Sequence, residues 1–349
     1  MNPSTDLPGD IWAGMAPVAE HGAMDRAAFE TQVQAAAEPA IMRGLVSDWP
    51  AVARGRESAE SLVQYITSFS NQQPIEYFYG APDINGRFFY SDDLNGFNFE
   101  RRQLTVDGFL QQLLSHLDDA APPYMYAGGI PVPRHLGALT SDNPMTLLAP
   151  GMERLTSLWV GNRTRTAAHW DLPQNIACVI RGQRRFTLFP IDQVQNLYVG
   201  SLEFTLAGQP LSLVDFHNPD LERFPRFAEA LKHAQVALLE PGDGLYIPSL
   251  WFHHVESMDP LGMMMNYWWR DAPDYMATPL LTLLHGLLTI RDLPEGERES
   301  WRVLFDHYLF QTNGDPWAHM PEDARGLFGE TTPENLAKLR AYLTKTLGG

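Results

Sequence analysis

The sequence contains one cysteine, Cys178, among its 349 residues. No disulfide can therefore form within the chain, and no zinc site built from several thiolates can be assembled. Basic residues are also few, with 25 Lys and Arg against 42 Asp and Glu, and they form no dense stripe that could follow a phosphate backbone. We therefore expect a reducing compartment and no nucleic acid partner.

Targeting and membrane segments are lacking as well. The first 25 residues contain no Lys or Arg and do not show the basic and then apolar layout of a secretory signal. The longest apolar run, residues 280–290, contains His285 and is far shorter than the roughly 20 residues needed to cross a bilayer. These features predict a cytoplasmic protein without a membrane segment.

Short strands dominate the middle of the chain. Between residues 155 and 269, short apolar runs alternate with Gly, Pro, Asn and Asp, and no long helical segment separates them. This pattern favours a sandwich or barrel over a parallel sheet of βαβ units. The predicted strands are residues 158–160, 176–180, 185–189, 236–239, 245–247 and 263–268.

Helices are expected on both sides of this region. Asp25 and Thr105 are typical helix caps, and the runs at 75–79 and 88–90 are typical of strands, so the first third is mixed α and β. The chain after Asp274 is predicted to form helices over 275–290, 297–310 and 333–347. We therefore expect an N-terminal extension over residues 1–35, a barrel domain with α/β additions over 36–272, and a helical segment over 273–349.

The C-terminal helical segment includes a leucine-rich surface. Six leucines lie between positions 280 and 288. Such a surface either packs on the barrel or meets a second copy of the chain, and we favour a homodimer formed through these helices.

The strongest chemical signal is His169-Trp170-Asp171, followed at a distance by His253. Residues i and i+2 of a strand project from the same face, so His169 and Asp171 could bind one ion. The pair alone is weak, because 11 His and 42 acids in this chain produce roughly one such pair by chance. Two histidines and one carboxylate form the facial triad of non-haem Fe(II) sites, in which three positions stay open.

The second histidine comes from a better-defined context. A turn at residues 240–243 and a strand at 244–247 precede His253 and His254. In a jelly-roll barrel, a turn followed by a strand and then a histidine brings that histidine to the mouth of the cavity as a metal ligand. Adjacent strand residues face opposite sides, so one of the two histidines enters the site, and spacing does not say which.

Several segments carry a resemblance to a known family. TRTAAHWDLPQN (164–175) and RGQRRFTLF (181–189) resemble the JmjC and cupin-like 2-oxoglutarate oxygenases, and within them the asparaginyl hydroxylases that act on hypoxia-inducible factor. Similarity continues through VDFHNPDLERFP (214–225), PGD (241–243), YIP (246–248), WFHHVES (251–257) and NYW (266–268). An entry segment, residues 39–45 with Trp49-Pro50, is also similar, so most of residues 36–270 is covered.

The resemblance implies a mainly β protein, a double-stranded β-helix (jelly-roll) barrel with flanking helices. It also implies that Fe(II) is held by His169, Asp171 and His253, with 2-oxoglutarate and O₂ as co-substrates. Residues near 2-oxoglutarate would be Thr166, Asn175, Asn266 and Tyr124. The implied reaction is hydroxylation of a protein side chain. N-methyl demethylation, hydroxylation of a small molecule, or a metal-binding scaffold without catalysis are the alternatives.

The sequence departs from the hydroxylase pattern in two places. The family lysine expected to bind the distal carboxylate of 2-oxoglutarate corresponds to Arg184, beside Arg185. Arginine can bind a carboxylate through two bonds, but alternating strand faces send the two arginines opposite ways. An Arg-Gln pair that contacts the substrate amide is replaced by residues 209–212, Gln-Pro-Leu-Ser. The substrate, a protein or a small molecule, is therefore left open.

Overall fold

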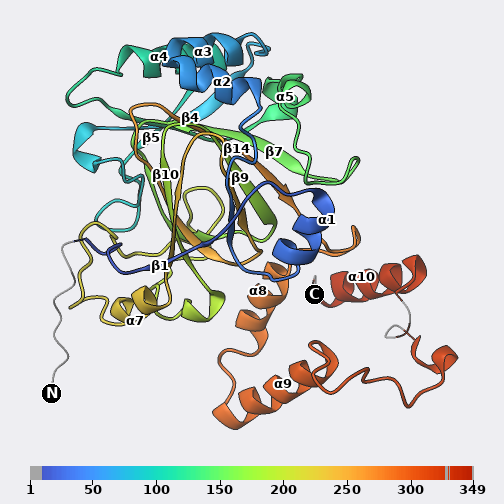
Figure 1. Cartoon of the computed structure of the whole chain (residues 1–349). Helices are drawn as coiled ribbons and strands as arrows, with labels where there is room; N and C mark the ends of the chain where they lie inside the picture. Colours follow the sequence, from blue (N-terminus) through green and yellow to red (C-terminus); the bar gives the residue numbers. More distant parts are fainter. Residues whose placement is uncertain (1–9, 327–328, 330, 348–349) are drawn as a thin grey trace. The chain divides into compact units, whose positions relative to one another are not determined.

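The computed structural model describes residues 10–326, 329 and 331–347. The chain divides into two compact units, Met1–Asp271 and Ala272–Gly349. The first contains the sheets and the second consists of helices and connecting segments (Figure 1).

Eight strands of the first unit form a barrel from two facing sheets. One sheet contains the order β11-β10-β13-β8 and the other the order β12-β9-β14-β7. Strands that follow one another in the chain change sheet at each step except between β10 and β11, which gives the double-stranded β-helix. The predicted jelly-roll fold is therefore confirmed. The strands are β7 (Leu155–Gly161), β8 (Arg165–Trp170), β9 (Gln174–Arg181), β10 (Arg184–Phe189), β11 (Gln235–Leu239), β12 (Gly244–Ile247), β13 (Phe252–Ser257) and β14 (Gly262–Trp269).

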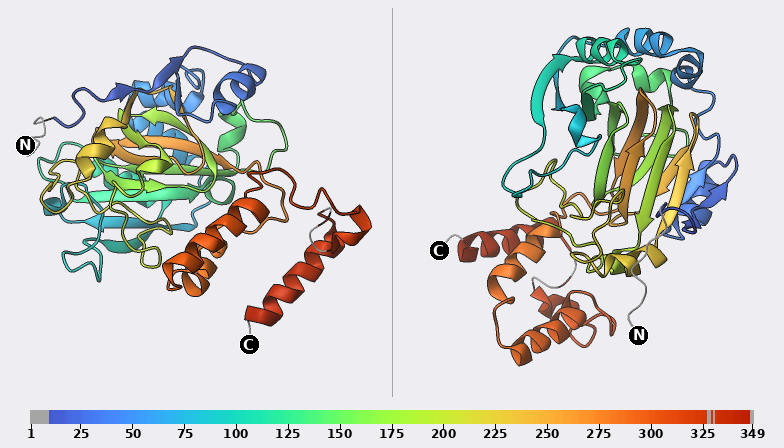
Figure 2. Two further views of the ribbon diagram at one scale, coloured as in Figure 1. Left: turned by 90° about the horizontal axis from the view of Figure 1, so that it is seen from below. Right: turned by 90° about the vertical axis from the view of Figure 1, so that its left-hand side faces the viewer.

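Six further strands extend the two sheets. β1 (Ala16–Pro17) pairs in parallel with β11 and completes a five-stranded sheet. The other sheet has nine strands, in the order β2-β3-β12-β9-β14-β7-β6-β4-β5. Residues 16–21, expected to lie in an extension, therefore join both sheets of the barrel (Figure 2). The added strands of the nine-stranded sheet are β2 (Ala19–His21), β3 (Ala40–Met42), β4 (Pro74–Gly80), β5 (Glu100–Thr105) and β6 (Tyr124–Pro131).

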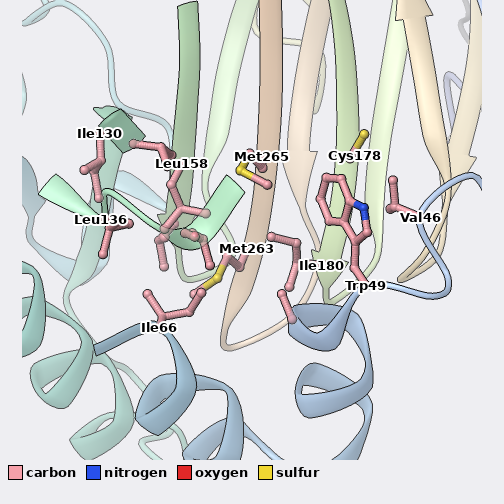
Figure 3. Close-up of a cluster of buried hydrophobic side chains, with 14 of the residues drawn as sticks. Val46, Trp49, Ile66, Ile130, Leu136, Leu158, Cys178, Ile180, Met263 and Met265 are labelled. Carbon is pink, nitrogen blue, oxygen red and sulfur yellow. The ribbon is translucent and has the colours of Figure 1, made fainter. Parts of the chain in front are cut away.

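The central strands β9 and β14 of the nine-stranded sheet are buried on both faces, which explains their nearly continuous hydrophobic runs. In β9, Ala177 and Val179 face the barrel interior, whereas Cys178 and Ile180 belong to a second core on the outer face. Figure 3 shows this outer core, in which Ile66 of α3 (Ala59–Thr67) and Trp49 lie close to the strand side chains.

Short helices cover that outer face (Figure 1). Asp25 and Thr105 act as the predicted helix caps, since their side chains accept bonds from Ala28 N at 2.9 Å and Gly108 N at 3.1 Å. The helices of this unit are α1 (Arg26–Ala28), π-helical η1 (Phe29–Gln34), α2 (Pro50–Glu57), α3 (Ala59–Thr67), α4 (Val106–Ser115), α5 (Val132–His135), α6 (Leu139–Asp142) and α7 (Phe227–Lys232), with 3-10 turns η2 (Pro82–Ile84) and η3 (Ile191–Gln193).

The second unit contains α8 (Leu280–Thr289), α9 (Glu295–Tyr308), the turn η4 (Glu322–Ala324) and α10 (Pro333–Leu347). The described parts of α8 and α9 bury no residue, and Leu281, Leu284 and Leu288 are exposed. Among the described residues, every helix is too short or too polar to reach across a bilayer. Dimer formation through these helices stays a prediction.

Candidate active site

The predicted metal ligands come together at one end of the barrel. The antiparallel pairing of β8 with β13 sets His169 directly opposite His253, and Asp171 follows the end of β8. The two imidazole rings lie 4.2 Å apart between centroids, and His253 Nε2 is 3.6 Å from Asp171 Oδ2. One ligand atom from each residue lies within 4.8 Å of the others, so a single ion can be bound by all three.

Hydrogen bonds orient both imidazoles for metal binding. His169 Nδ1 is 2.9 Å from the Ala167 carbonyl oxygen, and His253 Nδ1 is 3.1 Å from the Trp251 carbonyl oxygen. Because a carbonyl can only accept, each Nδ1 carries the proton and each Nε2 keeps its lone pair. Burial, together with the neighbouring imidazole of His169, lowers the pKa of His253 to about 4. His253 is therefore neutral at physiological pH, as a metal ligand must be.

His254 occupies the opposite face of β13, which settles the choice that spacing left open. Its ring stacks on Phe216 at 4.4 Å between centroids with an interplanar angle of 14°. The side chain is buried, and burial lowers its pKa to about 3. His254 is thus a neutral core residue and does not belong to the metal site.

Acid should destabilise the protein through His254. Its pKa is about 3 when folded and ordinarily 6.5, so between these values the unfolded chain binds a proton that the folded chain does not. Stability therefore falls as pH decreases through this window. Between pH 6.5 and 4.5, wild type should lose about 2–3 kcal/mol more unfolding free energy than His254→Gln. Urea unfolding at several pH values measures the difference, and parallel pH curves for the two proteins would contradict it.

A cavity of about 110 Å³ opens beside the three ligands. This is room for several water-sized groups, enough for a small co-substrate. Its walls are mostly apolar and aromatic, and come from both sheets and from a loop over residues 206–211. The lining residues are Phe78, Phe88, Tyr126, Gly128, Trp159, Thr166, His169, Asp171, Asn175, Phe186, Leu206, Ala207, Gln209, Leu211, His253, Val255, Met264, Asn266 and Trp268.

Arg184 is a buried cation with two unpaired guanidinium nitrogens. It is 1% exposed, its Nε and Nη2 atoms have no hydrogen-bond partner, and burial lowers its pKa. It lies two residues before Phe186, which lines the cavity, so both belong to the inward face of β10. A Cβ on Gly262 would overlap Ser257 Oγ, whereas Arg184 Nη2, at 3.6 Å, would be in ordinary van der Waals contact, so this glycine leaves room for Ser257.

Arg185 points to the other side of β10. It forms an ion pair with Glu256 and lies 3.5 Å from the centroid of the Trp12 ring. The two neighbouring arginines therefore have different surroundings. An unpaired buried guanidinium is costly, so Arg184 is suited to an anion such as a ligand carboxylate.

Comparison with known proteins agrees with this geometry. A family model described as a cupin-like domain matches residues 26–275. The chain belongs to the cupin-like domain family. Similar curated proteins include lysine-specific demethylase JMJ31 of Arabidopsis thaliana, 26% identical over 287 residues, which are 73% of this chain and 50% of that protein.

Two other relatives match shorter parts of this cupin-like domain. HSPB1-associated protein 1 of Homo sapiens is 34% identical over 124 residues, which are 35% of this chain and 25% of that protein. The tRNA wybutosine-synthesizing protein 5 of Mus musculus is 34% identical over 105 residues, which are 30% of each chain. The chain thus spans half or less of the length of these relatives.

The cupin-like barrel brings most of the predicted co-substrate residues to its cavity. Thr166, Asn175 and Asn266 line it. Asn175 is buried and its Oδ1 has no hydrogen-bond partner, while Asn266 Oδ1 accepts a bond from Trp159 Nε1 at 2.7 Å. The unpaired Asn175 oxygen is a second buried polar atom that a ligand could satisfy.

Two predicted site residues, Arg184 and Tyr124, are not among those that line the cavity; Arg184 lies on the inward face of β10. Tyr124 lines two outer pockets, and Tyr126, two residues further along β6, lines the cavity. Burial raises the pKa of the Tyr126 hydroxyl, while Arg184 and a hydrogen bond from the side chain of Thr166 act in the opposite direction. Sequence reasoning missed Tyr126 because both tyrosines fit the same loosely matched segment, and only the pairing of β6 with β7 separates them.

Proposed function

We propose that this cupin-like protein is an Fe(II)- and 2-oxoglutarate-dependent oxygenase that hydroxylates a C–H bond of a protein side chain. The observation that carries the proposal is the convergence of His169, Asp171 and His253 on one point beside an apolar cavity. Half of an octahedral coordination sphere would remain open for a chelating 2-oxo acid and O₂.

The residues present fit Fe(II). Two neutral Nε2 atoms and one carboxylate oxygen are the donor set of the facial triad, and the backbone bonds to Nδ1 fix both rings in the binding tautomer. When bound, iron with 2-oxoglutarate and O₂ would supply the oxidising power for C–H cleavage, with succinate and CO₂ as co-products. Asp171 and His253 are 5% and 4% exposed, so the polypeptide shields these two ligands from solvent, and His169 is partly buried.

The residues also fit 2-oxoglutarate. Arg184 would bind the distal carboxylate, with the hydroxyl groups of Thr166 and Tyr126 beside it. Asn175 and Asn266 line the same cavity and would orient the co-substrate. The arginine thus takes the part of the family lysine, and Tyr126 takes the part first expected of Tyr124.

The choice of substrate depends on the rest of the cavity. Gln209 lines it, although the Arg-Gln pair of the asparaginyl hydroxylases is absent from the 209–212 loop. Removal of an N-methyl group by the same chemistry is the second candidate, because one similar protein is named a lysine-specific demethylase. A scaffold without catalysis is disfavoured, since ligands, cavity and buried cation all occur together.

Anaerobic titration tests the proposal directly. Fe(II) is added to the purified protein, followed by 2-oxoglutarate, and the visible spectrum is recorded. A weak metal-to-ligand charge-transfer band should appear only after the 2-oxo acid is added, and admitting O₂ should bleach it while succinate forms. If the band does not appear with saturating Fe(II) and 2-oxoglutarate, the proposed function is wrong.

A further inference from the structure

Part of the wall of the active-site cavity is a chain of aromatic rings. Phe88 stacks on Tyr126, Tyr126 contacts Trp159, and Trp159 contacts Trp268, with centroid separations of 6.1, 6.1 and 5.6 Å. Leu206 and Leu211 continue this wall on the loop side. A substrate group that enters the cavity on this side loses its contacts with water and gains contacts with apolar side chains.

Negative charge is scarce in the same cavity. Among the described residues that line it, Asp171 is the only carboxylate, and that group is assigned to the metal. The charges of a divalent metal and of Arg184 are balanced by Asp171 and the two carboxylates of 2-oxoglutarate. No negative charge is left to compensate a cationic substrate, which would lose its hydration on entry.

The aromatic wall does not replace the missing carboxylate. A cation can be held by the faces of aromatic rings, but Phe78 at the end of this wall already has the Arg101 guanidinium 4.9 Å from its centroid. The other face-to-face contact of Phe78 is with Phe99, at 4.3 Å. Arg101 is itself paired with Glu76, and it already makes the contact that the Phe78 ring could offer to a cation.

We infer that the group oxidised at this site is an uncharged, apolar side chain or its small-molecule equivalent, and not an N-methylated lysine. The inference rests on the proposed oxygenase function and narrows it to hydroxylation. Gln209 at the edge of the cavity is the one neutral hydrogen-bonding side chain on the loop side, where it could fix the backbone or a polar edge of such a substrate.

Two isosteric probes test the charge preference. Choline and 3,3-dimethylbutan-1-ol have the same shape and differ in the positive charge. Each is titrated anaerobically into the protein loaded with Fe(II) and 2-oxoglutarate, and the shift of the charge-transfer band is followed. The neutral alcohol should shift the band at a concentration at least about tenfold lower than choline, because desolvating the cation is unfavourable.

The readout separates the two proposals. Absence of the band itself contradicts the oxygenase function before any probe is added. If the band forms and choline shifts it at an equal or lower concentration, or the neutral alcohol does not shift it, the inferred substrate class is wrong.

A carboxylate placed at the cavity edge should reverse the preference. Ala207 is exposed and lines the cavity, so Ala207→Glu adds a negative charge without filling the core. Choline should then act at a concentration at least about tenfold lower than in wild type. Leu202→Glu, at an exposed position before the 206–211 loop and outside the cavity lining, is the matched control and should leave both titrations unchanged. An unchanged choline response in Ala207→Glu would overturn the electrostatic explanation.

Discussion

Asp171→Ala is expected to reduce succinate formation from 2-oxoglutarate by more than about 100-fold. Loss of groups that merely orient metal ligands costs roughly 10–100-fold in metal affinity or activity, and Asp171 would be a direct ligand. The charge-transfer band should also disappear at Fe(II) concentrations that saturate wild type. The decisive measurement is succinate formed per protein under saturating 2-oxoglutarate.

Two controls distinguish loss of the metal from loss of the fold. Asp83→Ala removes an exposed carboxylate far from the triad in sequence and should retain full turnover. Without metal, Asp171 is a buried carboxylate, so its removal should not lower the unfolding midpoint of the metal-free protein. Full turnover by Asp171→Ala would show that the carboxylate is not required and would contradict the metal assignment.

Arg184→Met should weaken the binding of 2-oxoglutarate by at least about 30-fold. Removing one partner of a buried, hydrogen-bonded charge pair costs about 2–5 kcal/mol, and tenfold in affinity corresponds to about 1.4 kcal/mol. The effect should appear as an increased KM for 2-oxoglutarate at an unchanged affinity for Fe(II). Arg184→Lys, which keeps the charge, should recover part of the loss.

The neighbouring arginine is the matched control. Arg185→Met breaks an ion pair with Glu256 on the opposite face of β10, so it should lower stability while leaving the KM for 2-oxoglutarate unchanged. Removal of the unpaired Arg184 charge should not lower the stability of the free protein. If the two variants change the KM equally, Arg184 does not have the special role proposed for it.

The positions of the strands and the identity of the metal ligands could be predicted because both depend on the pattern of residue types within short segments of the sequence. Apolar runs broken by turn residues located six barrel strands, and all six predicted segments fall within β7, β9, β10, β11, β12 and β14. The spacing of His169 and Asp171 placed two ligands on one face. The run at 88–90, also predicted as a strand, has one isolated bridge, at Tyr90, because its rings pack in an aromatic cluster and the backbone forms no ladder.

Features that depend on register could not be predicted from spacing. Thr166 and His169 are three residues apart, which would place them on opposite faces of a regular strand. Both line the cavity because the pairing of β8 with β13 is irregular between His253 and Val255. The choice of Tyr126 over Tyr124 likewise depends on how β6 is placed against its neighbouring strands, whereas the choice of Arg184 over Arg185 came from the family resemblance.

Residues 16–21, which pair with both sheets, have a consequence for how the protein folds as it is synthesised. Ala16 of β1 pairs with Gln235, and the buried Val18 packs in the barrel interior. β1 therefore cannot pair until the chain has been synthesised at least as far as residue 235. Pairings so distant in sequence are slow to form. We therefore expect the two sheets to pack together first, and residues 16–21 to pair with both of them in one of the last steps of folding.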